Sequence, residues 1–517
     1  MGFKGLFFIF HEPIQYLFFF PAIFGRIREL ASCDNQKVRL SSLKAIAKLA
    51  HKADDILIQY FDPSFIDPIF QNVHDFTNPE LIYFSLKIID GLTRDNPKFQ
   101  NLIIAGNLIN AFLEVVQNLL NEIEKNPAYT EMAGKDQIIL LGFQIFGNIG
   151  LNFVLTEEQL NIIFSFVINY LSAPVFGAKL YSLSCLESLF AFSPNYLNSP
   201  PTSILHSPEN PQISTPLNKS KSSDPQSNHV DQQLNLYEQK VNLLKIFLNE
   251  IIFNQILTCF FWKNDQFDEE AENERLILSN HAFVVASNMC LTFKEEASRR
   301  FITSELISLY QIPEHILTDD TTKTEDFMSN YVKMLGIIFQ NVRKINHTPE
   351  IKSILPILRD FTSNLIPNLI DYTQNASFPI KESTIYTICQ LINFNSSDIL
   401  HVIINGNNGL ICFFIDNLNN LCPRIACESL RALRVLFQFG CDIQIENEPN
   451  IMLKEALLNG LDDAIEEAYE TFEDNDYTLI QLDEFKKDVE NKKRFAAIDQ
   501  EIIDIREEDP NDFSFVM

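Results

Sequence analysis

Apolar residues return every three or four positions through most of the chain. This spacing is that of one face of an α-helix, so it predicts amphipathic helices over most of the sequence. In the segment 42–49 the order of serine, leucine, lysine, isoleucine and leucine recurs in 85–92, a shift of roughly 40 residues that is typical of a repeated group of helices.

The same helix returns further along the chain. Two close copies are 182–189 and 429–436, and degenerate copies end at Ile149, Met289, Val342 and Leu391. One such unit cannot bury its apolar face alone, so neighbouring copies must stack on one another. We therefore predict an all-α fold, a right-handed α-solenoid of stacked helical repeats.

Two glycine-containing segments make this repeat resemble the armadillo family. In 103–113 and 403–414 a glycine, Gly106 or Gly406, precedes an apolar helix, as the family's turn glycine does. The resemblance implies a short helix followed by two longer antiparallel helices in each repeat. Because glycine suits a left-handed position after a helix end, we expect Gly106 to adopt it. HEAT-type repeats, with a similar period and no fixed glycine, are the nearest alternative.

Composition divides the chain into five segments. We expect a hydrophobic N-terminal cap segment at 1–25, armadillo-like repeats at 26–192 and 235–485, a disordered Ser/Pro/Asn-rich insertion at 193–234, and an acidic tail at 486–517. Within the insertion, four residues precede a proline and are candidate acceptors for proline-directed kinases: Ser193, Ser199, Ser207 and Thr215. A neutral low-complexity insertion is the competing interpretation.

The charge balance limits the classes of partner. With 68 acidic and 40 basic side chains, the net charge of -28 repels phosphate backbones and attracts basic peptides and proteins. We therefore expect a protein partner, with a basic or extended segment, and no nucleic acid. The apolar runs near the N-terminus are interrupted by His11, Glu12, Pro13 and Pro21, which predicts no membrane span.

Cysteine usage indicates a reducing compartment. The chain has nine cysteines and no C-x-x-C pair, so we expect reduced core thiols in a cytoplasmic protein, with the nucleus as a second location. We also expect the solenoid to be a monomer. Four cysteines, Cys412, Cys422, Cys427 and Cys441, lack the paired spacing of zinc ligands, which favours packing over metal binding.

No motif for catalysis is present. The sequence has no phosphate-binding glycine loop, no H-E-x-x-H and no G-x-S-x-G. We expect no cofactor, no metal and no catalytic residue, and interpret the chain as a non-enzymatic scaffold that binds a partner segment along the concave face of its superhelix. An enzyme or an enzyme regulator is a further alternative.

Amide side chains occupy one repeated position, directly before the terminal apolar residue of the helix. They are Asn148, Asn288, Asn341 and Gln390. An amide both donates and accepts, so a row of amides can bind the backbone of an extended peptide. This arrangement is similar to the asparagine ladder of importin-α and implies an adaptor for basic nuclear-localisation peptides. The family's tryptophan positions hold Gln144, Val284 and Ile337 instead, and its basic N-terminal arm is missing.

Overall fold

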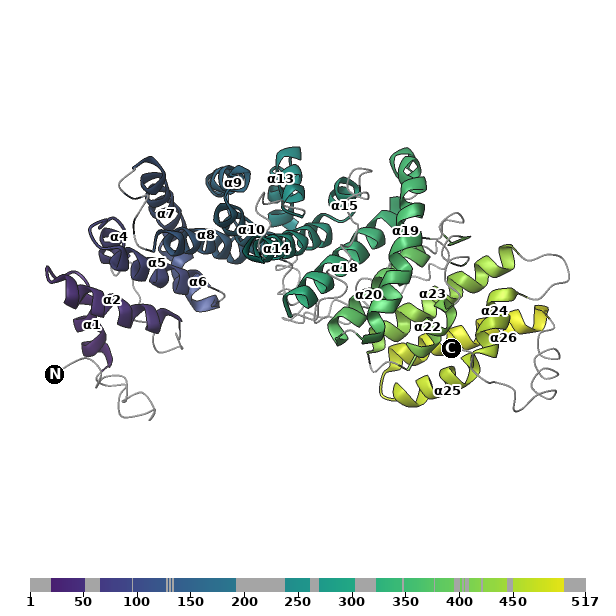
Figure 1. Cartoon of the computed structure of the whole chain (residues 1–517). Helices are drawn as coiled ribbons and strands as arrows, with labels where there is room; N and C mark the ends of the chain where they lie inside the picture. Colours follow the sequence, from purple (N-terminus) through teal and green to yellow (C-terminus); the bar gives the residue numbers. More distant parts are fainter. Residues whose placement is uncertain are drawn as a thin grey trace, which may run out of the picture. The chain divides into compact units, whose positions relative to one another are not determined.

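The computed structural model describes the greater part of the chain, and its described residues form helices without strands. The described residues are 20–51, 66–94, 96–126, 129, 132, 134–191, 238–260, 269–302, 322–345, 348–375, 377–394, 400–401, 404, 409–419, 422–443 and 450–496. They fall into two compact units, Met1–Cys259 and Phe260–Met517. Figure 1 shows the helices of both units.

The first unit has two layers of helices. Its first row consists of α2 (Gln36–His51), α5 (Pro79–Thr93), α8 (Lys135–Asn152) and α10 (Phe176–Leu189), each of which packs against the next. A second row packs on them and consists of α4 (Ile66–Val73), α7 (Leu108–Lys125) and α9 (Glu157–Ser172) (Figure 1). Three more helices belong to this unit. Helix α1 (Phe20–Leu30) packs on α2. The other two are α6 (Pro97–Ala105) and α13 (Glu250–Phe260), which lies at the boundary of the unit.

The second unit repeats this plan. Its first row is α14 (Glu269–Phe293), α18 (Thr322–Val342), α20 (Phe378–Asn393), α23 (Pro423–Asp442) and α26 (Asp476–Ala496). Against this row pack α15 (Glu295–Phe301), α19 (Pro349–Asn375), α22 (Leu410–Asp416), α24 (Ile451–Leu458) and α25 (Leu461–Thr471).

The helix predicted from the repeated motif is the first-row helix in every case. The copies at 42–49, 85–92, 182–189 and 429–436 lie in α2, α5, α10 and α23, and the degenerate copies lie in α8, α14, α18 and α20. Their shared apolar positions are buried, with Leu43, Ile46, Leu86 and Ile89 at 0% exposure. The prediction of an all-α repeat fold is therefore confirmed.

The short, long, long order of helices identifies the repeat type. α6 meets α7 at 90°, and α8 follows. The helix Glu238–Lys245 also meets α13 at 90°, and α24, α25 and α26 repeat the order with Gly460 in the left-handed region at φ 83°. This order is that of armadillo repeats, whereas α9 and α10 follow α8 without a short helix.

The expected role of Gly106 needs a correction. The residue with positive φ at the α6–α7 bend is Asn107, at φ 50°, and not Gly106. Asparagine tolerates this conformation better than most residues. The space around Gly106 is tight instead, because a Cβ there would lie 3.1 Å from Leu108 Cγ and 3.2 Å from the Leu102 carbonyl oxygen.

Several predicted segments extend beyond the described residues. The insertion at 193–234 lies outside them, and so do Ser193, Ser199, Ser207 and Thr215. Helix α1 begins within the predicted cap segment, and α26 continues past residue 485 to Ala496. The insertion, the tail and the phosphorylation sites stay predictions.

One described helix could cross a membrane by length and composition alone. It is Ala271–Phe293 within α14, with a mean hydropathy of 1.4, and counting two bent helix pairs as spans raises the number to 3. In the structure α14 packs against α15 and α18, and 56% of its apolar window is buried. The absence of a membrane span stays a prediction.

Candidate functional site

Polar side chains of the first row bind partners about one repeat away in sequence. Five such hydrogen bonds join Asn148 to Asp90, Asn330 to Asn280, Tyr386 to Gln340, Gln390 to Glu428 and Arg431 to Tyr477. Their sequence separations run from 38 to 58 residues. Each bond fixes the position of one repeat against the next, in addition to the nondirectional apolar contacts between them.

In the first unit the bond from Asn148 reaches the carboxylate of Asp90, which is 1% exposed on α5. Arg94 Nη2 lies 3.0 Å from Asp90 Oδ2, and Lys87 Nζ and His51 Nε2 each lie 3.7 Å from it. Asn148 Nδ2 donates to Asp90 Oδ1 at 2.9 Å. A buried carboxylate requires such partners because it has lost its hydration. The group joins α2, α5 and α8, and we call it the Asp90 cluster.

The histidine of this cluster favours its neutral form at neutral pH. Burial is the main cause that lowers the pKa of His51, and the nearby Arg94 guanidinium lowers it further, while Asp90 acts in the opposite direction. His51 therefore adds little positive charge to the cluster at neutral pH.

In the second unit a chain of polar contacts crosses three first-row helices. Gln390 on α20 is 2% exposed, and its Nε2 donates to Glu428 Oε2 on α23 at 3.1 Å. Arg431 binds the same glutamate at 2.9 Å and donates to Tyr477 Oη on α26 at 3.1 Å. These contacts hold α20, α23 and α26 in register.

Tyr386 adds a second contact between repeats of this unit. Its hydroxyl donates to Gln340 Oε1 at 2.6 Å, and the Arg424 guanidinium lies 4.7 Å from the centre of its ring. Burial raises the pKa of Tyr386 far above its ordinary value, so the phenol remains protonated and keeps donating.

The predicted amide ladder is distributed over both units. Asn148 lies in the first unit, and Asn288, Asn341 and Gln390 lie in the second. Asn341 is 7% exposed, and its Nδ2 donates to the Cys290 carbonyl at 2.8 Å and to Ser298 Oγ at 2.9 Å. Gln390 is held by Glu428 as described, and Asn288 is half-buried on α14. A peptide would have to compete with these internal contacts, and the ladder stays a prediction.

One stripe on each first-row helix of the first unit remains at least partly exposed. We call these four stripes the open face. Its residues are Lys37, Ser41, Lys44 and Lys48 on α2; Phe84, Lys87 and Arg94 along and just after α5; Leu140, Gln144 and Asn148 on α8; and Leu180, Ser184 and Glu187 on α10. The α2 and α5 stripes touch, since Lys44 Nζ lies over the Phe84 ring, and Asn148 of the α8 stripe reaches the buried Asp90 of α5.

The sequence pattern gave no indication of five residues that make these contacts: Asp90, Glu428, Arg431, Tyr386 and Tyr477. Asp90 occupies a motif position that other copies fill with Ala47, Glu187 or Arg434. Because the residue type varies so widely at this position, the motif alone carried no signal for a cluster. A charged residue inside an apolar helix was the available clue.

The described residues offer little for small-molecule chemistry. Nowhere among them do three His, Cys, Asp or Glu side chains come together as metal ligands would. Of the four cysteines weighed for zinc, Cys427 is buried beside Thr478, and the other three are partly exposed.

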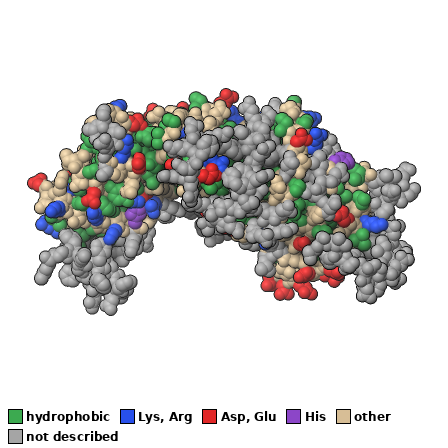
Figure 2. All heavy atoms as spheres, viewed as in Figure 1, with side chains coloured by type: hydrophobic (Ala, Val, Ile, Leu, Met, Phe, Trp, Pro, Cys, Tyr) green, Lys and Arg blue, Asp and Glu red, His purple; other side chains and the backbone are tan. Residues whose placement is uncertain are grey.

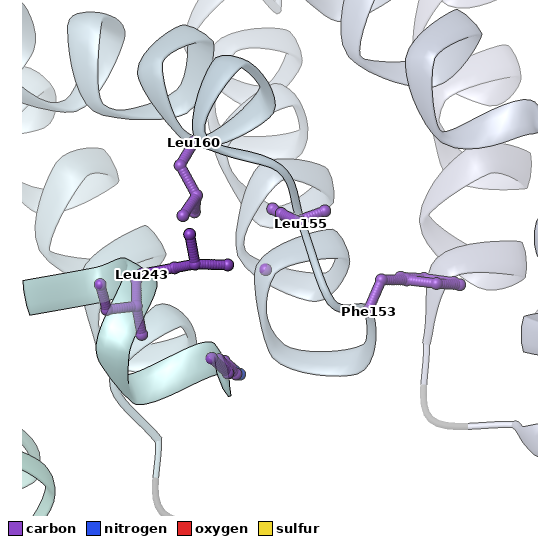
Figure 3. A pocket seen from close by; sticks show the side chains of 7 residues that line it. Phe153, Leu155, Leu160 and Leu243 are labelled. Atoms are coloured by element: carbon purple, nitrogen blue, oxygen red, sulfur yellow. The ribbon is translucent and has the colours of Figure 1, made fainter. Parts of the chain in front are cut away.

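A small pocket lies where the helix Glu238–Lys245 meets the end of α8. Leu155, Leu160 and Leu243 converge on it in Figure 3, and it has room for about one water molecule. Lys240 Nζ donates to the Leu151 carbonyl at 3.1 Å, and burial lowers the pKa of Lys240 to about 8. This lysine binds an end carbonyl of α8, which is a structural role.

Comparison with known proteins gives no sequence relative. No protein-family model and no curated protein matches the sequence. Among solved structures, an engineered protein is similar over 91% of this chain and 98% of its own, with a TM-score of 0.43 and 10% identity. Computationally designed armadillo repeat proteins for modular peptide recognition are similar over 60% of this chain and 98% of their own, with a TM-score of 0.33 and 9% identity.

Scores this low leave the assignment of the fold to the helices themselves. The first-row helices coincide with the repeated motif, and the short, long, long order recurs in α6–α7–α8 and in α24–α25–α26, with a 90° bend after α6. The chain is an all-α solenoid of armadillo-type repeats.

Proposed function

We propose that the chain is a non-catalytic protein-interaction scaffold whose open face holds a segment of another protein. The observation that carries this proposal is that α2, α5, α8 and α10 pack one against the next and that each has a stripe of exposed or half-buried residues. Helical repeats use such continuous surfaces to bind extended or helical segments.

The size of the open face suits a macromolecule. Packed helices lie 8–10 Å apart, so four of them span roughly 30 Å. An extended segment of about nine residues covers that distance. Because the small pocket beside Lys240 has room for about one water molecule, a protein segment fits the geometry better than a metabolite.

Site-specific cross-linking tests the proposal. A photoreactive amino acid at Gln144 or Ser184 on the open face should capture a discrete partner from an extract of the source cells, and excess unmodified protein should compete for it. Glu114 and Asn118 are exposed on α7 in the second row and serve as control positions. Equal capture at both sets of positions, or none at either, would contradict the proposal.

The importin-α-like alternative predicts a specific ligand. It is supported by the position of Asn148 on the open face and by the net charge of -28. A labelled lysine-rich peptide should then bind saturably, and Asn148→Ala, Asn288→Ala and Asn341→Ala together should abolish that binding, with circular dichroism confirming the fold. Binding that ignores the three substitutions and vanishes with salt would remove this alternative.

Two further expectations belong to the same proposal. A location in the cytoplasm or the nucleus rests on the number and spacing of the nine cysteines in the sequence. An enzyme regulator remains distinguishable from a passive scaffold, because the activity of the captured partner would change on binding.

A further inference from the structure

The charge of the open face differs from that of the whole chain. Helix α2 carries Lys37, Arg39, Lys44 and Lys48 and no acidic residue. Three of these lysines share one stripe of α2, while Arg39 is turned to Asp75 at 2.7 Å. We call Lys37, Lys44 and Lys48, together with Lys87 and Arg94 of the α5 stripe, the basic stretch. Figure 2 shows Lys and Arg side chains over this part of the first unit.

Two acidic groups of the described chain are in contact with the basic stretch. Glu80 lies 3.6 Å from Lys44 and is exposed, and Asp90 lies beneath Lys87 and Arg94 at 1% exposure. On the adjoining α8, the stripe is made of uncharged Leu140, Gln144 and Asn148. The basic stretch thus has five cationic side chains, and of the two carboxylates described against it Asp90 is buried.

Asp90 also orders the basic stretch. It accepts from Arg94 at 3.0 Å and from Asn148 at 2.9 Å, with Lys87 at 3.7 Å. Side chains held in one geometry lose less conformational entropy when they bind a ligand. The buried carboxylate thus prepares two cations for an external anion.

An aromatic ring lies between the charges. Lys44 Nζ is 4.9 Å from the centre of the half-buried Phe84 ring, and Tyr83 lies edge-on to Phe84 at 5.1 Å. A ring beside cations can contact an apolar side chain of a peptide while the cations bind its carboxylates. Bare anions such as phosphate make no use of such a ring.

We infer that the basic stretch on α2 and α5 docks an acidic segment of a partner protein, one in which carboxylates alternate with apolar side chains. This inference rests on the proposed scaffold function and names the chemistry of its ligand. Elsewhere the acidic surface repels such a segment, and at about 0.1 M salt this repulsion is screened beyond about 10 Å. Attraction at the basic stretch then decides where the segment binds.

Fluorescence anisotropy with labelled peptides tests the inference. In one peptide glutamate alternates with leucine, and in the other it alternates with serine. The test variant is Lys37→Gln, Lys44→Gln and Lys48→Gln. Its matched control removes the same charge from α26 in the other unit by Lys486→Gln, Lys487→Gln and Lys492→Gln. A third variant, Lys37→Arg, Lys44→Arg and Lys48→Arg, keeps the charge of α2.

We expect saturable binding at about 0.1 M salt that weakens about tenfold or more in the α2 glutamine variant, because three attractive charges are lost. The α26 control and the arginine variant should stay within about twofold of wild type. No binding by wild type, or an equal loss in the α26 control, would overturn the inference. The inference would also be overturned if phosphatidylserine vesicles or a single-stranded oligonucleotide displaced the peptide at a lower concentration of negative charge than that of the peptide.

The two proposals can fail separately. Cross-linking at Gln144 and Ser184 does not depend on the charge of the partner. If those positions capture a partner while the acidic peptide does not bind, only the assignment of an acidic ligand is wrong. If neither result appears, the scaffold function itself is contradicted.

Discussion

Replacing Asp90 with alanine should destabilise the first unit by about 2–3 kcal/mol. The carboxylate is 1% exposed and accepts from Asn148 at 2.9 Å, and a hydrogen bond to a charged group contributes about 1.5–3 kcal/mol. The pair with Arg94 adds less than about 1 kcal/mol, because that guanidinium is 53% exposed. The relief of no longer burying a carboxylate offsets part of the loss.

Urea unfolding followed by far-ultraviolet circular dichroism measures this free energy. A matched control is Glu29→Gln, which breaks an ion pair with Arg26 whose side chains are 68% and 67% exposed. We expect that control to cost less than about 0.5 kcal/mol. If Asp90→Ala costs no more than Glu29→Gln, the Asp90 cluster contributes nothing to stability, and the argument that it orders the basic stretch fails with it.

Three other substitutions test the packing of the repeats. Phe143→Ala on α8, where the ring is fully buried against Tyr170 at 4.9 Å, should cost about 3–5 kcal/mol and identify which unfolding transition belongs to the first unit. Gly336→Ala would place a Cβ 2.6 Å from Thr387 Oγ1, so calorimetry should show the second unit destabilised by about 1–2 kcal/mol. Gly25 has open space around it, so Gly25→Ala should stabilise α1 by about 0.5–1 kcal/mol. Burial lowers the pKa of Lys240 to about 8 from 10.5. Between these two pH values Lys240 is protonated in the unfolded chain and neutral in the folded one. The free energy of unfolding of the wild type should therefore rise as pH rises from 8 to 10.5. That gain should be absent in Lys240→Met when urea midpoints are compared across the same pH series, and an identical pH profile for both proteins would contradict the burial argument.

The fold could be predicted because it depends on a local pattern. Apolar positions at helical spacing mark each first-row helix, and their recurrence fixes the stacking whatever residues lie between them. The bend at Gly106 was predicted for the correct place and assigned to the wrong residue, because either glycine or asparagine can adopt positive φ and only the structure shows that Asn107 does so.

The site was harder to predict because each polar residue depends on a partner in another repeat. Asn148 and Asn341 occupy the same motif position, yet Asn148 binds a carboxylate at a partly exposed site while Asn341 is buried against a carbonyl and a serine. The net charge of -28 also concealed a basic stretch, since a sum over the chain carries no information on where the charges lie.

The hydrogen bonds between neighbouring repeats have a mechanical consequence. Within each unit, a first-row helix contacts the helices directly before and after it and is tied to them by contacts such as Asn148 to Asp90 or Gln390 to Glu428. A tensile load is therefore carried in series, one pair of helices at a time, and the weakest pair yields first. Under force the repeats should unfold one at a time, so the protein lengthens in steps of one repeat. When the force is released, the repeats should refold in any order.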